Sequence, residues 1–398
     1  MGQRHIVGIR DALNMQRPSR YQKITHNGRL GRCMTKRILM VHDYPPMQGG
    51  GLEINTFEVS RELVKRGYDV CIATTRGQSE TCKMPTPTES EGVKIRILGK
   101  VDELDEIIKF YDVVWAQMTF SIREGALYGI KVARERGKRV FVTLHTSPAH
   151  IPYSALRLMD VREKSLRIDS LLFELNHPNV NIVVPTKVLR DELVAFGVEG
   201  EMNVIQVGVS DFSKSISEKR KDFDIVVVGE VSYLKGVNYV LDAVNRLKKN
   251  GQTFSCRIVG GGSELDLVKA LSFTLGLESH VHFEGYVDHG RIYQLLKQSK
   301  LLVHASLTEV MPLAIIEALV VGTPVIGSDV GMIPEIINAT QGGLVFPRGD
   351  AVTLSEKMSY LLNNKDERHA MSQRAQLKAL ELYSLETQVD NIERIIRD

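Results

Sequence analysis

Short apolar runs alternate with longer amphipathic stretches from residue 37 onward. In the first half the apolar runs are rich in β-branched residues, and helical patterns near residues 54–65, 123–136 and 187–196 separate them. We expect strands at residues 37–42, 69–74, 112–116, 139–144 and 181–184. Continuous apolar strands joined by helices are typical of βαβ units, in which helices cover both faces of a parallel sheet.

The alternation breaks where residues 210–222 turn polar and charged, which is typical of an inter-domain linker. It then restarts, with a helix expected at residues 237–248. Further strands are expected at residues 224–228, 254–259, 281–283, 301–304 and 324–326. The pattern predicts an α/β chain with two doubly wound, Rossmann-like domains facing a cleft, with a ligand site at the carboxyl ends of both sheets. The predicted boundaries are a tail at 1–35, domains at 36–210 and 223–380 joined by a linker at 211–222, and a final segment at 381–398.

The predicted tail has no apolar period and is strongly basic. Its basic residues are Arg4, Arg10, Arg17, Arg20, Lys23, Arg29 and Arg32, against the single acid Asp11. We interpret it as a disordered basic tail or as sequence upstream of a true start at Met34. An organelle transit peptide, which is also rich in arginine and poor in acids, is the alternative.

Composition narrows the class of protein. A chain of 398 residues suits two domains better than one core. The net charge of +3 does not favour a nucleic-acid partner. We see no secretory signal and no apolar run near the roughly 20 residues that span a bilayer. The four cysteines form no C-x-x-C pair, so we expect a cytoplasmic protein.

Three glycine-containing segments each follow an expected strand. Segments 43–53 and 229–236 lead into a helix, and 260–264 suits a tight turn over a nucleotide. Glycine lets backbone N–H groups approach a ligand, and a helix N-terminus favours an anion. Lys235 would add a positive charge beside a phosphate. The plain alternatives are flexible turns and a solvated lysine.

Two glutamates, Glu309 and Glu317, are separated by seven residues. Glu317 lies in an apolar helical stretch, where a buried carboxylate needs a partner. The hydroxyls of a ribose are one such partner; a helix-cap glutamate with a salt-bridged core glutamate is the alternative. The loop at 328–335 would bring further backbone amides to the same edge.

Metal binding is not indicated, and we expect no cofactor. His145 and His150 are five residues apart, Pro148 and Pro152 argue against a helix there, and no third ligand stands out. The D-x-D sequence at 222–224 begins a strand, so it lies at the edge opposite the predicted ligand site.

With these segments in order, the chain resembles the family-4 retaining glycosyltransferases of the GT-B fold from about Arg37 to the C-terminus. The Glu309/Glu317 pair, followed by Gly-Thr-Pro-Val at 322–325, carries most of the resemblance. The resemblance implies a nucleotide-sugar donor in the second domain and an acceptor in the first: a glycan, a lipid-linked intermediate or a small molecule. It implies that residues 386–397 form a helix crossing back to the first domain.

The resemblance also implies roles for individual residues. Glu317 would bind the ribose, Glu309 the donor sugar hydroxyls and Lys235 the diphosphate. His145 resembles the histidine that reaches the donor sugar, with an ordinary loop histidine as the alternative. The remaining donor-binding candidates are Gly50, Gly51, Gly229, Gly261, Met332 and Ile333.

Two departures from the family pattern stand out. Glu230 replaces the usual arginine, and a carboxylate facing a diphosphate would repel it by a few kcal/mol, as an order of magnitude. Glu230 then points away, or Arg348 substitutes for the arginine, or donor binding is weakened. The second departure is Gln-Val-Gly-Val-Ser at 206–210, at the end of the first domain.

Three interpretations remain open at this stage. The first is an active, metal-independent transferase that reacts by front-face attack, in polysaccharide or glycolipid biosynthesis. The second is another enzyme on the same scaffold, such as a nucleotide-sugar epimerase or a glycosyl phosphorylase. The third is a partner subunit that binds the donor weakly or not at all. Residues 154–175, rich in Leu, Met and Arg, form either a membrane-surface helix or an ordinary helix packed on the sheet.

Overall fold

The computed structural model describes residues 36–42, 50–74, 88–119, 124–148, 159–211 and 222–397. The predicted tail, most of the predicted linker and His150 lie outside these residues. Residues 37–398 form one compact unit that contains two separate β-sheets. The last strand of the first sheet ends at residue 204, and the first strand of the second sheet begins at residue 223.

The first sheet has eight strands in the order β3-β4-β2-β1-β5-β6-β7-β8, parallel except for the β3–β4 pair. Its strands are β1 (Arg37–His42), β2 (Asp69–Thr74), β3 (Glu89–Ser90), β4 (Val93–Ile97), β5 (Val113–Met118), β6 (Arg139–Leu144), β7 (Val180–Val184) and β8 (Met202–Val204). Alternate side chains of β1 enter two different cores: Leu39 and Val41 one, Ile38 and Met40 the other. Burial on both faces explains why this strand is continuously apolar.

Helices cover both faces of this sheet. They are α2 (Gly51–Lys65), α3 (Glu103–Ile108), α4 (Glu124–Glu135), α5 (Val161–Leu175) and α6 (Lys187–Phe196). Buried side chains of α3, α4, α5 and α6 share the core of Leu39, whereas α2 packs into the core of Ile38. Thr186 begins α6 as its N-cap, and Gly197 ends it in the left-handed conformation.

The second sheet has six strands in the order β11-β10-β9-β12-β13-β14, all paired in parallel. The strands are β9 (Phe223–Val228), β10 (Cys256–Val259), β11 (Val281–Gly285), β12 (Ser299–His304), β13 (Val325–Ser328) and β14 (Gly343–Phe346). The short 3-10 helix η3 (Tyr233–Lys235) follows β9. The helices are α7 (Val237–Lys249), α8 (Leu265–Thr274), α9 (His289–Gln298), α10 (Leu313–Val320), α11 (Ile333–Thr340), α12 (Ala351–Asn363) and α13 (Lys365–Leu382).

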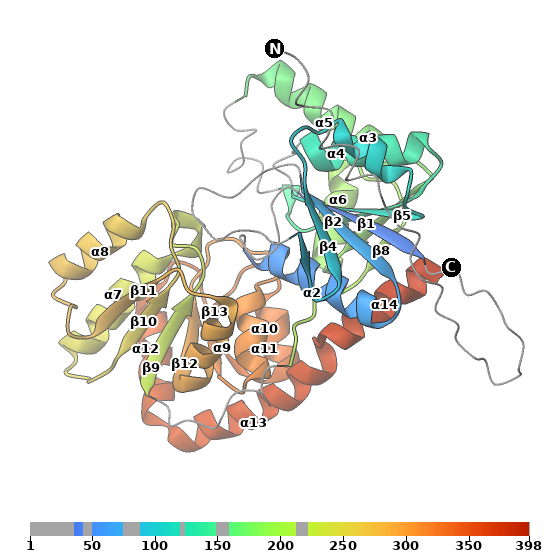
Figure 1. Cartoon of the computed structure of the whole chain (residues 1–398). Helices are drawn as coiled ribbons and strands as arrows, with labels where there is room; N and C mark the ends of the chain where they lie inside the picture. Colours follow the sequence, from blue (N-terminus) through green and yellow to red (C-terminus); the bar gives the residue numbers. More distant parts are fainter. Residues whose placement is uncertain are drawn as a thin grey trace, which may run out of the picture. The chain divides into compact units, whose positions relative to one another are not determined.

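The last helix, α14 (Leu385–Arg397), returns to the first sheet (Figure 1). Val389, Ile392 and Ile396 are buried in the same core as Ile38 of β1. Each buried side chain of this size contributes about 1.5–3 kcal/mol. The Arg139 guanidinium also donates to the carbonyls of residues 396 and 395, at 2.6 and 2.7 Å. The structure therefore confirms the predicted crossover helix. Within the described part of the chain, no helix combines the length and the apolar character that a membrane span requires.

Candidate functional site

The loops that the sequence singled out in the second half follow the carboxyl ends of β9, β10, β12 and β13, at one edge of the second sheet. We call this the carboxyl edge of the sheet. Backbones cross so closely here that only glycine fits. A Cβ on Gly260 would lie 1.9 Å from the carbonyl oxygen of Gly229, and one on Gly331 would lie 1.9 Å from that of Glu309. These glycines allow the loops to pack together.

Lys235 and Glu309 meet at this edge. The Lys235 Nζ atom lies 2.5 Å from Glu309 Oε2, and the two side chains are 30% and 15% exposed. His304 Nε2 lies 3.3 Å from the same carboxylate oxygen and accepts from or donates to the Ser306 hydroxyl at 3.0 Å. Burial raises the pKa of Glu309, but the charge of Lys235 and the hydrogen bond from His304 outweigh it. The pKa therefore falls well below its usual range, and the carboxylate stays ionised.

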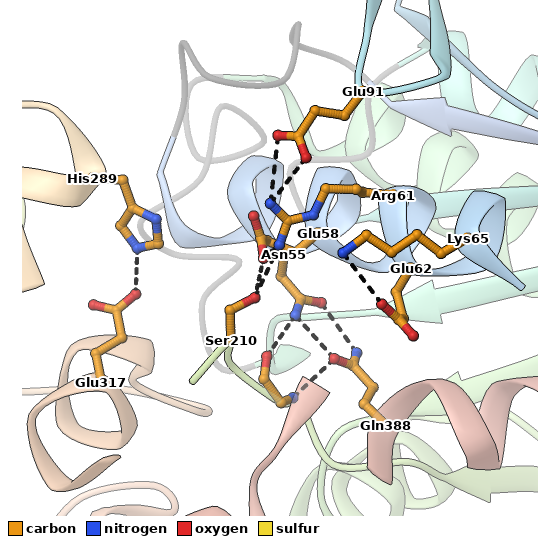
Figure 2. Close-up of polar contacts among 11 residues, drawn as sticks. Asn55, Glu58, Arg61, Glu62, Lys65, Glu91, Ser210, His289, Glu317 and Gln388 are labelled. Carbon is orange, nitrogen blue, oxygen red and sulfur yellow. Dashed lines mark hydrogen bonds and ion pairs between the residues drawn. The ribbon is translucent and has the colours of Figure 1, made fainter. Parts of the chain in front are cut away.

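Glu317 lies inside α10 and is only 5% exposed. One of its oxygens, Oε1, is 2.7 Å from Nε2 of His289, the first residue of α9 (Figure 2). Burial lowers the pKa of His289, but the hydrogen bond and the charge of Glu317 raise it by more. Both glutamates therefore have partners within the chain. The alternative of a salt-bridged core glutamate fits Glu317, but Glu309 does not cap α10, whose N-cap is Pro312. Sequence reasoning missed His289, because a single histidine at a helix start forms no recognisable pattern.

His145 lies on the first sheet, directly after β6. Its Nε2 atom is 2.7 Å from Gln117 Oε1 on the neighbouring strand β5. Burial, and then the nearby His42, lower the pKa of His145 to about 3, so the imidazole is neutral near pH 7. His42 follows at the end of β1, 3.9 Å from Glu53 Oε1. These groups gather at the carboxyl edge of the first sheet.

The start of α2, a helix that packs on the first sheet, lies against α10 of the second half. A Cβ on Gly51 would lie 2.6 Å from the side chain of Leu313, the first residue of α10. Gly50, the N-cap of α2, is exposed. The rest of this loop, 43–49, lies outside the described residues. The first amides of α2, which an α-helix leaves without internal acceptors, therefore lie beside the helix that carries Glu317.

The other predicted amides are mostly engaged inside the chain. The Met332 amide donates to Val310 at 3.1 Å, the Ile333 amide to Val330 at 3.2 Å and the Gly229 amide to Val259 at 3.0 Å. The carbonyl of Gly261 accepts from Val231 at 2.8 Å. The donor contacts of Gly229, Gly261, Met332 and Ile333 stay predictions, and three of these four amides would have to share or exchange an acceptor.

Glu230 and Arg348 both reach the carboxyl edge of the second sheet. Glu230 is exposed at the end of β9. Arg348, which is also exposed, follows β14 and donates through Nη1 to the carbonyl of Leu307 at 3.4 Å. The amide of Leu307 in turn donates to Leu234 at 2.8 Å, so Arg348 lies near the backbone that carries Lys235.

The acidic sequence at 222–224 lies at the opposite edge, as predicted. Asp224 is the second residue of β9, where its carboxylate accepts from the Ser255 amide at 2.8 Å and from Lys300 Nζ at 2.6 Å. The described ranges contain no group of three His, Cys, Asp or Glu side chains arranged to hold a metal ion. The expected absence of a metal cofactor stays a prediction.

Comparisons with known proteins agree with this architecture. The family model Glycosyltransferase Family 4 matches residues 49–211, and Glycosyl transferases group 1 matches residues 209–378. An uncharacterized glycosyltransferase of Methanocaldococcus jannaschii is 22% identical over 349 residues, covering 79% of this chain and 85% of the relative. The N-acetyl-alpha-D-glucosaminyl L-malate synthase of Bacillus anthracis is 22% identical over 384 residues, covering 89% and 95%.

Among solved structures, Anabaena HepE in complex with UDP and glucose superposes with a TM-score of 0.73 at 18% identity. The superposition covers 91% of this chain and 99% of that one, and it shows a shared fold. The two family models together run from residue 49 to residue 378, in the order of the two sheets. The chain therefore belongs to the family-4 glycosyltransferases of the GT-B fold.

Proposed function

We propose that this protein is a retaining, metal-independent glycosyltransferase that moves a hexose-like sugar from a nucleotide-sugar donor to an acceptor. The observation that carries the proposal is that Lys235, Glu309 and Glu317 share one sheet edge. The positive charge of a lysine attracts a diphosphate, and buried carboxylates accept hydrogen bonds from ribose and sugar hydroxyls. The neutral imidazole of His145 would contact the donor sugar from the first sheet.

A uridine diphosphate sugar is the first donor to test. The solved structure of HepE contains UDP and glucose. The Bacillus anthracis relative is named as an N-acetyl-alpha-D-glucosaminyl L-malate synthase. These names belong to those proteins, so the experiment below includes other bases.

The charges at the edge suit departure of a diphosphate. When the anomeric carbon–oxygen bond breaks, its electron pair stays on the phosphate oxygen and positive charge develops on the sugar. Lys235 would stabilise the leaving group. We propose that the acceptor oxygen attacks on the face the phosphate leaves, and that its proton passes to the departing phosphate oxygen. Glu309, which is ion-paired with Lys235, would accept hydrogen bonds from the sugar hydroxyls and would form no covalent bond with the sugar.

Donor binding and slow donor hydrolysis test this proposal directly. UDP-, GDP- and ADP-sugars would be titrated with EDTA present, using wild type, Lys235→Ala and Glu317→Gln. Lys249→Ala and Glu356→Gln are matched controls, because both residues are exposed on helices of the same half. We expect one donor to bind and hydrolyse, with both activities lost only in the two site variants.

Other outcomes would contradict parts of the proposal. An inverted anomeric product by NMR would contradict retention, and loss of activity in EDTA would contradict metal independence. A trapped covalent glycosyl group on Glu309 would contradict front-face attack.

A donor-weak partner subunit is the second candidate, and the exposed carboxylate of Glu230 at this edge favours it. Failure of every donor to bind would support that candidate. Epimerisation of the donor without transfer would support an epimerase instead.

We also propose a cytoplasmic location with peripheral membrane contact through α5. One side of α5 packs on the first sheet through Leu171 and Leu175, which are fully buried. Val161, Leu166 and Phe173 are 84%, 61% and 66% exposed. Exposed apolar side chains of this kind are able to enter the surface of a bilayer.

A further inference from the structure

The carboxylate of Glu317 lies in strongly apolar surroundings. Its neighbours in α10, Ile315, Ile316, Ala318 and Leu319, are all fully buried. A buried carboxylate is costly unless it is paired and hydrogen-bonded. His289 supplies such a partner, because its Nε2 atom lies 2.7 Å from Glu317 Oε1.

The ring of His289 is held in place from its own helix. Asp288, the N-cap of α9, accepts from the Arg291 amide at 2.9 Å and fixes the start of the helix. One turn further on, the Tyr293 ring packs edge-on against His289 with 5.0 Å between ring centroids. An anchored imidazole fixes the orientation of the carboxylate it contacts, as supporting residues do in other functional sites.

Acidic groups surround His289 on several elements. Glu317 of α10 contacts it, Asp288 precedes it on α9, and the charge of Glu58 on α2 raises its pKa through space. Glu58 is itself paired with Arg61 at 2.5 Å and hydrogen-bonded to Ser210 (Figure 2). Tyr293 stays un-ionised, because burial raises its pKa. These charges favour the imidazolium form of His289.

We propose that His289 is a positioning residue for donor binding, which holds the Glu317 carboxylate where the donor ribose binds. This inference rests on the proposed function. His289 engages Oε1, and a carboxylate has a second oxygen able to accept from ribose hydroxyls. The imidazolium also adds positive charge near an anionic donor. Donor affinity therefore falls as pH rises through the pKa of His289, because deprotonation removes this charge.

Two variants separate the hydrogen bond from the charge. His289→Gln keeps a side-chain N–H donor but does not titrate, whereas His289→Leu removes both. His282→Gln is the control, since His282 is an exposed histidine on β11. The probe is UDP-glucose, whose diphosphate diester does not titrate in the range used. Its Kd would be measured by calorimetry from about pH 5.5 to about pH 8.5, around the usual pKa of histidine.

We expect the wild-type Kd to rise several-fold across this range and the His289→Gln Kd to stay flat. His289→Leu should bind about tenfold more weakly or worse, as expected for loss of a charge-assisted hydrogen bond. His282→Gln should follow wild type, and circular dichroism would confirm that His289→Gln is folded.

A wild-type pH slope in folded His289→Gln would overturn the inference and leave the proposed function intact. If His289→Leu bound UDP-glucose with wild-type affinity, the inference would likewise be overturned and the proposed function left intact. Failure of wild type to bind this probe and every other nucleotide sugar would instead remove the proposed function, and the inference with it.

Discussion

Replacing Lys235 by methionine removes a charge and keeps most of the side-chain volume. The lysine is 2.5 Å from a carboxylate that is 15% exposed. At an effective dielectric constant of about 20, two unit charges about 4 Å apart attract by about 4 kcal/mol. Because Lys235 is 30% exposed, solvent screening and desolvation reduce the net value, and we expect a loss of about 1–3 kcal/mol in the free energy of unfolding.

The pH dependence of this loss has a definite sign. The folded-state pKa of Glu309 is depressed, so its stabilising contribution is present above the unfolded pKa of about 4.3 and lost as pH falls toward the folded value. Without Lys235, burial raises the pKa of Glu309, and the hydrogen bond from His304 opposes part of that rise. The stability difference between wild type and Lys235→Met should therefore be largest near neutral pH and shrink below about pH 4.3.

The rate of donor hydrolysis should also fall. Loss of one group that stabilises a leaving group costs about a hundredfold in rate. Urea denaturation at several pH values and donor hydrolysis at saturating donor would measure the two effects, with Lys249→Met as the control. A stability difference that is independent of pH would refute the assigned ion pair, and an unchanged hydrolysis rate would refute the role of Lys235 in departure of the diphosphate.

Three further predictions follow from specific contacts. Gly331→Ala should destabilise the fold by more than about 1 kcal/mol in urea denaturation, because φ is +52° and the added Cβ meets the carbonyl of Glu309; a neutral effect would contradict this. Gln388→Leu should cost about 1–3 kcal/mol, because Asn55 Oδ1 loses the donor Gln388 Nε2 at 3.1 Å and the Gly208 amide loses the acceptor Gln388 Oε1 at 2.9 Å; equal denaturation midpoints would contradict it. Phe173→Glu should reduce co-sedimentation with anionic vesicles several-fold, and unchanged sedimentation would exclude α5 as the contact.

Strands buried on both faces were the easiest elements to predict. The expected ranges 37–42, 69–74 and 139–144 match β1, β2 and β6 residue for residue. Sequence analysis missed β4, where Lys94 and Arg96 interrupt the apolar run near the edge of the sheet, and the short edge strand β14. A pattern based on continuous apolar runs detects central strands and fails at edges, because an edge strand does not need two buried faces.

In the candidate site, too, some residues were predictable from the sequence and others were not. Glu309, Glu317 and Lys235 were found because glutamates at a fixed spacing and a lysine between a strand and a helix leave a local signal. The partners of these residues leave none. His289 precedes Glu317 by 28 residues, and only the packing of α9 beside α10 brings the two side chains together. Contacts of this kind depend on the fold, so a single sequence does not reveal them.

The same reasoning bears on Glu230, the departure from the family pattern. What a diphosphate experiences is the sum of charges near it in space, whichever sequence positions supply them. Arg348 follows a different strand, yet its guanidinium donates to the carbonyl of Leu307. The amide of Leu307 donates to the carbonyl of Leu234, the residue before Lys235. The carboxyl edge thus keeps two cations, although the position after β9 carries a carboxylate. A repulsion argued from Glu230 alone therefore overstates the loss of donor affinity, and the active transferase remains the better-supported function.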